Sequence, residues 1–515
     1  MRMFRRLAQA FAPQPSVDEA GVRRGLRWLT RNGLGIQLME TLHAGPLLTA
    51  FALEIGATNL MIGVLAAMPH WAQLVQVPGV YLVNRYRNRK VLYLIGGLLS
   101  RPMLLAMALA AFITSADWAI TVLIVAFAFR YGFGGILATS QNPWMRDLVP
   151  DHVMGRFFGR RLMLMTALGA VLSLLAAGFI DLWRIEDWAP PRYAYVPLFV
   201  VAFLGGLFSI YCMLRVPEPK MPVDPNPVNL YRRLREPLRD ANFRRLLHFL
   251  STWNFAINLA APFFTVHMLK ALELEVSLVL AFTTLSQLTN ILVLRGWGRV
   301  ADRFSNKSVM ALCAPLFIAM IFAWTFTTLP GPHLLTIPLL VVIHALTGVA
   351  TAGVTLAAGN MALKLAPKGD ASAYLATNSL FTAVAAGTAG ILGGLLADFF
   401  VGRELSLSLQ WSSPEAALSL TTLDVRDWDF FFLFATVIGV YSISRLAHVH
   451  EPGQPASDRL VLQELILGSR QSVRNLSSVA GLRAATEFPM HLVEGKDGPA
   501  SGGDKPKPPP QGPPP

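Results

Sequence analysis

The sequence predicts an all-α integral membrane protein in which twelve transmembrane helices form two pseudo-symmetric six-helix halves. Three observations support this fold class. Apolar residues make up 53% of the 515-residue chain and charged residues only 15%, whereas a soluble domain has about 25% charged residues. The apolar residues are gathered in runs of roughly 18–25, the length that crosses a bilayer as a helix. The third observation is an internal repeat that relates the two halves of the sequence.

Each apolar run is expected to be a helix because lipid offers no hydrogen bonds, and a helix satisfies its own backbone groups. Strands of an outer-membrane barrel would alternate in polarity every second residue, and these runs do not. In chain order, the predicted spans are residues 33–53, 59–82, 91–113, 118–140, 158–182, 194–215, 246–269, 276–298, 308–329, 334–361, 371–399 and 429–447.

The polar stretches divide the chain into five parts. We expect a basic N-terminal segment at 1–32, a six-helix bundle at 33–215, a cytoplasmic connector at 216–245, a second six-helix bundle at 246–447 and a cytoplasmic tail at 448–515. The end of the tail is rich in proline and is expected to be disordered. Three smaller expectations are a surface helix at 231–245, a polar loop at 400–428 and an amphipathic helix at 458–490.

The basic residues predict the sidedness of the protein. The formal net charge is +13, which by itself is also typical of nucleic-acid binding. However, only five of the 44 lysines and arginines fall in the predicted outer loops: Arg184, Arg192, Lys270, Arg403 and Arg426. Basic loops stay in the cytoplasm, so topology explains the charge and no nucleic-acid partner is expected. The prediction is a multi-pass protein of a bacterial-type plasma (inner) membrane, with both termini cytoplasmic.

Motifs of other function classes are missing. Cys212 and Cys313 both lie in apolar runs, which predicts neither a disulfide framework nor a metal site. There is no H-E-x-x-H, no G-x-S-x-G and no phosphate-binding P-loop. We therefore expect neither an enzyme nor an ATP-driven pump, and no cofactor.

The internal repeat rests on four matches that occur in the same order in both halves, at offsets of 216, 218, 214 and 217 residues. Such a constant offset indicates two related units of the kind found in transporters. The matched pairs are Ala44–Thr49 with Ala260–Thr265, Val83–Arg89 with Ala301–Lys307, Arg130 and Gly134 with His344 and Gly348, and Leu148–Pro150 with Leu365–Pro367.

Two of these segments resemble signatures of the major facilitator superfamily, over about residues 30–450. Gly298–Lys307 is similar to the family's loop G-x-x-x-D-R-x-G-R-K, with Ser305 and Asn306 in place of glycine and arginine. Arg130–Gly134 is similar to R-x-x-Q-G, with Phe133 in place of glutamine. The G-P signature of drug/proton antiporters is missing from span 5. The resemblance implies a secondary transporter with alternating access, in which spans 1, 4, 7 and 10 line a central cavity.

The same resemblance implies a gate on the cytoplasmic side. The family's loop aspartate, here Asp302 followed by Arg303, holds that side closed against a neighbouring helix. We expect Asp302 to meet the start of span 5, which carries Arg156 and Arg160. In the corresponding loop of the first half, Asn84 and Arg85 are expected to face the start of span 11. An asparagine brings no charge, so this second contact is expected to be weaker.

Ionisable groups inside the spans are the strongest candidates for chemistry, because burying them in lipid is costly. Gln37, Glu40 and His43 share one face of span 1, and Arg130 lies at a similar depth in span 4. We expect Glu40 and Arg130 to face each other, with His43 and His344 nearby. Such a pair couples proton uptake to substrate movement if it opens during transport. Alternatively, it only neutralises two charges and fixes the packing.

Polar stripes on three further spans have two interpretations, because amides in a membrane either bond across helices or line a wet cavity. We expect Asn254 and Asn258 of span 7 to line the cavity. The stripes on spans 2 and 8 are expected to bond neighbouring helices. They comprise His70, Gln73 and Gln76, and Thr283, Gln287 and Asn290.

The function predicted from the sequence is secondary active transport of a small molecule by alternating access, coupled to a proton or another ion. A non-transporting membrane assembly factor or scaffold on the same fold is the alternative. The buried ionisable groups favour transport, since a scaffold has little use for them. The expected partners are the lipid bilayer, a small-molecule substrate and the coupling ion.

Overall fold

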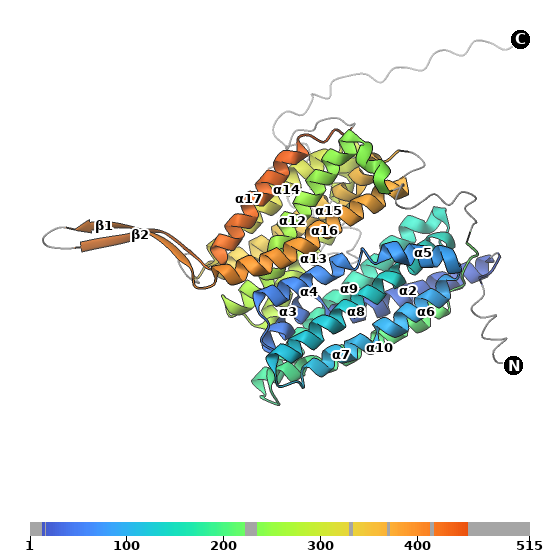
Figure 1. Cartoon of the computed structure of the whole chain (residues 1–515), viewed down its shortest axis with the longest axis horizontal. Helices are drawn as coiled ribbons and strands as arrows, with labels where there is room; N and C mark the ends of the chain where they lie inside the picture. Colours follow the sequence, from blue (N-terminus) through green and yellow to red (C-terminus); the bar gives the residue numbers. More distant parts are fainter. Residues whose placement is uncertain are drawn as a thin grey trace, which may run out of the picture.

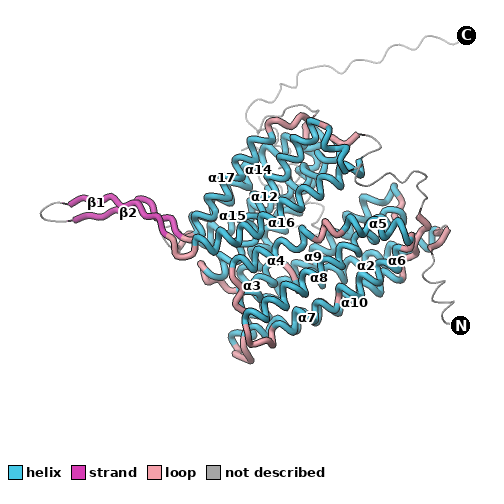
Figure 2. Tube along the Cα trace, viewed as in Figure 1, coloured by secondary structure: helices cyan, strands magenta, loops and turns pink. Residues whose placement is uncertain are grey.

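The computed structural model describes residues 13–15, 17–221, 234–328, 333–367, 371–412 and 417–451. These residues form two helical bundles that lie side by side, with a β-hairpin projecting from one end (Figures 1 and 2). The predicted fold class is confirmed. Ten helical segments among the described residues are long and apolar enough to cross a membrane. The two other predicted spans coincide with α2–α3 and α12, which carry more polar residues.

The first bundle, here the N-half, contains helices α2 to α10. Three of its spans are built from two consecutive helices each. Their bounds are α2 Glu19–His43 and α3 Gly45–Glu54, α4 Asn59–Trp71 and α5 Gln76–Tyr86, α6 Arg89–Ser100 and α7 Pro102–Ala110, then α8 Ala116–Leu148, α9 Asp151–Ile185, the 3₁₀ helix η1 Pro191–Ala194 and α10 Tyr195–Leu214.

The second bundle, here the C-half, repeats this order with fewer interruptions. Its elements are the 3₁₀ helix η2 Glu236–Arg239, α12 Ala241–Lys270, α13 Val276–Arg303, α14 Asn306–Ala323, η3 Trp324–Thr327, α15 Thr336–Lys364, α16 Ala371–Phe400, the strands β1 Glu404–Ser412 and β2 Ala417–Arg426, and α17 Trp428–Leu446.

The first span is broken at Ala44, between α2 and α3. Gly45 adopts the left-handed backbone conformation with φ of 62°, which a glycine reaches without steric cost. Pro46 follows it in the first turn of α3. The matched segment of the second half has Ala261 before Pro262, and there α12 remains continuous. A glycine before the proline, present in one half only, therefore distinguishes the two repeats.

Glycines bring the two halves into close contact where α4 meets α16. A Cβ atom built on Gly63 would collide with the backbone carbonyl of Gly390, and one on Gly394 would come within 2.6 Å of the backbone at Asn59 and Leu60. Small residues allow such close backbone packing in membranes. The glycines at this contact therefore allow the backbones of α4 and α16 to approach closely.

The bundle has two distinct ends. The hairpin end carries β1 and β2, and the basic end carries both termini of the described chain (Figure 1). Within the segment 400–428, expected as a polar loop, the described residues instead form two antiparallel strands, β1 and β2, with a register shift between Leu407 and Ser408. The expectation of a loop was based on the overall polarity of the segment and is wrong. The alternation Leu405-Ser406-Leu407-Ser408 has the period of two that is typical of a strand.

At the basic end, each half is secured by a glutamate that caps the start of one helix. Glu218 accepts hydrogen bonds from the backbone N–H groups of Arg89 (2.7 Å) and Lys90 (3.1 Å) at the start of α6. Glu451 accepts them from the N–H groups of Asn306 (3.3 Å) and Lys307 (2.7 Å) at the start of α14. Carboxylates are stabilising at helix N-termini. Each half is therefore braced internally.

Some predictions lie outside the described residues. The first residues of the surface helix expected at 231–245, residues 231–233, are not described. The described remainder contains η2 followed by the start of α12. The tail beyond residue 451, including the amphipathic helix expected at 458–490, is not described.

Candidate functional site

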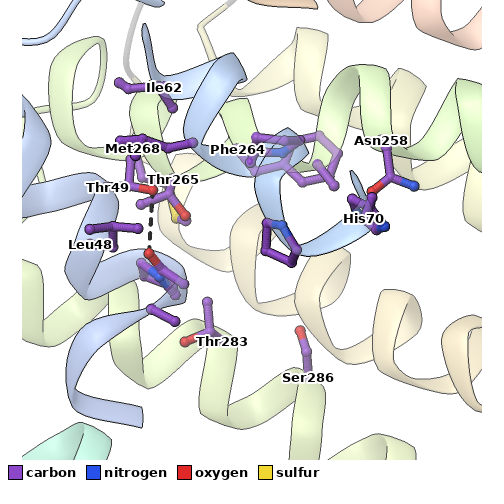
Figure 3. Close-up of a pocket in the computed structure, with 18 of the residues that line it drawn as sticks. Leu48, Thr49, Ile62, His70, Asn258, Phe264, Thr265, Met268, Thr283 and Ser286 are labelled. Atoms are coloured by element: carbon purple, nitrogen blue, oxygen red, sulfur yellow. Dashed lines mark hydrogen bonds between the residues drawn. The ribbon is translucent and has the colours of Figure 1, made fainter. Parts of the chain in front are cut away.

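A cavity of about 420 Å³ lies between the two halves. It is built by the first, second and fourth spans of the N-half and by α12, α13 and α15 of the C-half. Figure 3 shows His70 of the N-half beside Asn258 of the C-half at this cavity. No aspartate, glutamate, lysine or arginine is among its described lining residues. The polar residues that line it are Thr49, His70, Tyr131, Asn258, Thr265, Thr283, Ser286, His344 and Thr347.

The break in the first span opens into this cavity. Ala44, Gly45 and Pro46 all line it. Discontinuous helices at the centre of a transporter leave backbone groups free to meet substrate or ions. The sequence signal for this break is the pair Gly45-Pro46, whose counterpart in the second half is Ala261-Pro262.

Glu40 and Arg130 form an ion pair beside the cavity, as the sequence predicted. Glu40 Oε1 accepts a hydrogen bond from Arg130 Nη2. The hydroxyl of Tyr131, which lines the cavity, donates to Glu40 Oε2 at 3.2 Å. The Arg130 side chain is 4% exposed and that of Glu40 34%. The Glu40 side chain is thus partly exposed, whereas that of Arg130 is buried.

His43 is positioned next to this pair. Its Nδ1 lies 2.6 Å from the carbonyl oxygen of Met39, so the proton of the neutral ring is assigned to Nδ1. Its Nε2 lies 3.9 Å from Glu40 Oε2 and has no hydrogen-bond partner among the described residues. His43 therefore presents a free basic nitrogen toward the carboxylate.

His344 lies in the C-half and does not contact the Glu40–Arg130 pair. Ser286 Oγ donates to the His344 carbonyl at 2.8 Å and lies 3.0 Å from the ring Nδ1. This assigns the proton to Nδ1 and leaves Nε2 as a buried acceptor with no partner in the described part of the chain. His344 lines the same cavity as Tyr131, whose hydroxyl bonds Glu40.

The amides of the first and seventh spans are used in different ways. Gln37 donates to Thr41 at 3.0 Å on its own helix. Asn254 donates to the carbonyl of Leu250 (2.7 Å) and does not line the cavity, whereas Asn258 does. The predicted cavity role of span 7 therefore applies to Asn258 alone.

Spans 2 and 8 contribute more to the cavities than the sequence indicated. His70 and Thr283 line the central cavity, and Gln287 and Asn290 line a neighbouring pocket. The expectation that these stripes only bond neighbouring helices is wrong at those positions. The spacing of the residues reveals a polar face, but it does not tell whether that face meets another helix or open space.

The neighbouring pocket, of about 770 Å³, lies toward the basic end between α9 of the N-half and α13 and α15 of the C-half. It shares Ser286 with the central cavity. Its lining consists of Arg156, Gly159, Arg160, Leu162, Met163, Thr166, Ser286, Gln287, Asn290, Ile291, Leu294, Arg295, Gly348 and Thr351. Two of the predicted gate residues, Arg156 and Arg160, therefore line a pocket.

At the hairpin end, two aspartates join the halves. Asp398 at the end of α16 accepts hydrogen bonds from the N–H groups of Asn59 (3.1 Å) and Leu60 (2.9 Å), which begin α4. Asp181 of α9 accepts one from the N–H of Ser277 (3.0 Å), at the start of α13. Asp181 and Asp398 are 217 residues apart, so these contacts obey the internal repeat.

The predicted gate contact at the basic end is not formed in this conformation. Asp302 is exposed and makes no hydrogen bond or ion pair with any described residue. Asn84 and Arg85 are also exposed, and Arg303 lies over the ring of Phe304 at 5.4 Å. The gate therefore remains a prediction for a state in which the basic end is closed.

Comparison with protein families agrees with this architecture. The profile of the Major Facilitator Superfamily matches residues 33–335 and 246–479. No curated protein matches the chain significantly.

Solved structures share the fold at low sequence identity. A nucleoside transporter, NupG, superposes with a TM-score of 0.61 at 13% identity over 84% of this chain and 100% of its own. A bacterial homologue of the iron transporter ferroportin, in an inward-facing state, gives 0.57 at 11% identity over 83% and 98%. A bacterial Spinster homologue, inward-facing and unoccupied, gives 0.51 at 14% identity over 90% and 98%. At such identities the likeness concerns the fold alone.

Proposed function

Starting from the fact that this chain belongs to the Major Facilitator Superfamily, a family of membrane transporters rather than enzymes, we propose that it moves a small molecule by proton-coupled alternating access. The observation that carries the proposal is the Glu40–Arg130 ion pair, which is bonded to Tyr131, a residue that lines a cavity between the two halves. A charge pair placed there is sensitive to how the halves move.

The contacts of Glu40 support proton coupling. While Arg130 and the Tyr131 hydroxyl hold it, the carboxylate is stabilised in its ionised form. A substrate that draws either partner away leaves a poorly compensated charge in a membrane, which favours proton uptake. His43 Nε2, 3.9 Å from the carboxylate, offers a neighbouring site for the same proton.

The conformation supports the alternating-access part of the proposal. The aspartate contacts close the hairpin end, while the larger pocket lies toward the basic end. With the basic end in the cytoplasm, as the distribution of arginine and lysine favours, this is an inward-facing state of a plasma-membrane protein. Opening the hairpin end requires both aspartate contacts to break.

Uptake into proteoliposomes tests the function. Compounds that raise the melting temperature of the purified protein, drawn from a metabolite and drug panel, are offered with and without an imposed proton gradient. Gradient-dependent uptake of at least one compound is expected. If no compound is taken up, the scaffold alternative replaces transport.

Glu40→Gln then tests the coupling. The variant keeps the size of the side chain but cannot carry the charge, so uptake is expected to lose its dependence on the gradient. Glu54→Gln is the matched control, because Glu54 lies on the same span and is also paired with an arginine, Arg184, but at the hairpin end. Unchanged gradient dependence in Glu40→Gln would show that the pair only fixes packing.

A further inference from the structure

The pocket toward the basic end combines positive charge with an apolar wall. Three guanidinium groups line it: Arg156 and Arg160 from α9 of the N-half and Arg295 from α13 of the C-half. No aspartate or glutamate is among its described lining residues. Between the arginines and the central cavity, the wall is formed largely by Leu162, Met163, Ile291 and Leu294.

These three arginines differ from two arginines of the N-half that have partners in the protein. Arg130 is neutralised by Glu40, and Arg161 donates to the Leu29 carbonyl at 3.2 Å. Arg156, Arg160 and Arg295 are exposed and make no hydrogen bond or ion pair with the residues that the structure describes. Their donors are free to bind a ligand.

We propose that this pocket binds an amphipathic anion, meaning a carboxylate or phosphate group attached to an apolar body. Guanidinium groups bind these two anions through paired hydrogen bonds. Arg156 and Arg160 are one helical turn apart on α9 and share a face. With Arg295 on the opposite half, they surround an anion at the mouth of the pocket, and the apolar body lies against the leucine, methionine and isoleucine side chains.

The volume and position of the pocket fit this ligand. At about 770 Å³, it lies within the range of small-molecule sites, roughly 300–1,000 Å³, which are mostly apolar with a few placed polar groups. Because Ser286 belongs to both pockets, a ligand here adjoins the central cavity. Binding in this pocket does not depend on the proposed transport function. Only the passage of the ligand from the pocket into the central cavity rests on that function.

Equilibrium binding tests the proposal without requiring transport. The full chain is placed in nanodiscs of zwitterionic phosphatidylcholine and titrated with laurate and dodecyl phosphate. Dodecanol, which has the chain without the charge, and inorganic phosphate, which has the charge without the chain, serve as comparison ligands. Both amphipathic anions are expected to bind more tightly than either comparison ligand.

Three variants locate the site. Replacing Arg156, Arg160 and Arg295 by glutamine is expected to weaken laurate binding by about fivefold for each arginine, roughly 100-fold in total. Replacing Arg23, Arg24 and Arg27 by glutamine removes the same charge from α2, at the basic end and outside this pocket, and should leave binding unchanged. Thr351→Trp keeps the arginines but fills the pocket, and should also weaken binding.

A further titration distinguishes the source of the ligand. If phosphatidylglycerol added to the nanodisc competes with laurate in the wild type, the site takes anionic lipid from the bilayer. If it does not compete, the site takes a soluble amphipathic anion. The proposal is overturned if laurate binds no better than dodecanol, or if the triple-glutamine variant and its α2 control bind equally. The arginines then serve membrane topology only. Either failure leaves the uptake result for the proposed function intact.

Discussion

The two ends of the molecule hold the halves in opposite ways. At the hairpin end, Asp181 and Asp398 each cap a helix that belongs to the other half. At the basic end, Glu218 and Glu451 each cap a helix of their own half. The same interaction, a carboxylate on a helix N-terminus, therefore joins the halves at one end and braces each half separately at the other.

This difference explains how the halves can move as rigid bodies. Within a half, the capping glutamate connects the end of the last span to the start of the third, so the basic end keeps its shape when the halves separate. Between the halves, the contacts at the hairpin end rest on single side chains and on glycine packing, which can form and break. The following predictions test the comparison, from the largest expected effect to the smallest.

Arg89→Gln is expected to destabilise the protein most. Arg89 is fully buried, binds Asp147 (2.6 Å) and the Pro219 carbonyl (2.7 Å), and lies next to Glu218. Removing one partner of a buried ion pair costs about 3–5 kcal/mol. The measurement is the free energy of unfolding in detergent. Arg87→Gln, two residues earlier and at an exposed position, is the control. Equal stability of the two variants would contradict an internal brace.

Gly63→Val is expected to separate α4 from α16 at the hairpin end. The new side chain would collide with the Gly390 carbonyl, and overpacking of this kind costs about 1–3 kcal/mol. A lower melting temperature should accompany faster labelling of the central cavity from the hairpin side. Gly178→Val is the matched control, because a Cβ there meets no atom within 4 Å. Equal melting temperatures and labelling rates for Gly63→Val and Gly178→Val would contradict the prediction.

Neutralising both aspartates at the hairpin end is expected to shift the conformational equilibrium. Each charged contact with a helix N-terminus contributes about 1 kcal/mol, so Asp181→Asn with Asp398→Asn should change the ratio of states by roughly 30-fold. A cysteine at Thr49, which lines the cavity, reports this as faster reaction with an impermeant maleimide from the hairpin side. Asp117→Asn is the control, and an unchanged rate would mean that other contacts close this end.

Asp302→Asn is expected to have the smallest effect. Asp302 has no partner in this conformation among the described residues, so stability should change by less than about 0.5 kcal/mol. If Asp302 meets the start of α9 when the basic end closes, the variant should speed labelling of Thr351→Cys from the basic side, by up to about fivefold. The double-asparagine background populates that state. Asp302→Glu should behave like the wild type if the charge is what closes the gate.

Much of the architecture was predictable because a membrane span is a local property. A run of apolar residues must form a helix in lipid whatever its neighbours are, so every predicted span overlaps an observed helix. The family resemblance implied that the spans of Glu40 and Arg130 line one cavity, and the similar depths of the two residues then predicted the contact. The capping glutamates had a sequence signal too, since Val216-Pro217-Glu218-Pro219 resembles Val449-His450-Glu451-Pro452.

Tertiary structure alone decided which groups meet across the two halves. Whether Gln287 and Asn290 bond a helix or line a pocket depends on the rotation and tilt of α13, which distant packing sets. Packing also decides which aspartates find a partner. Asp302 has none among the described residues, whereas Asp398 joins the two halves. The sequence by itself determined the spans, the repeat and the charge asymmetry of the ends, because these depend on residues close together in the chain. Which end of the molecule is closed depends on contacts between residues more than 90 positions apart. The geometry of these contacts exists only once both halves are packed.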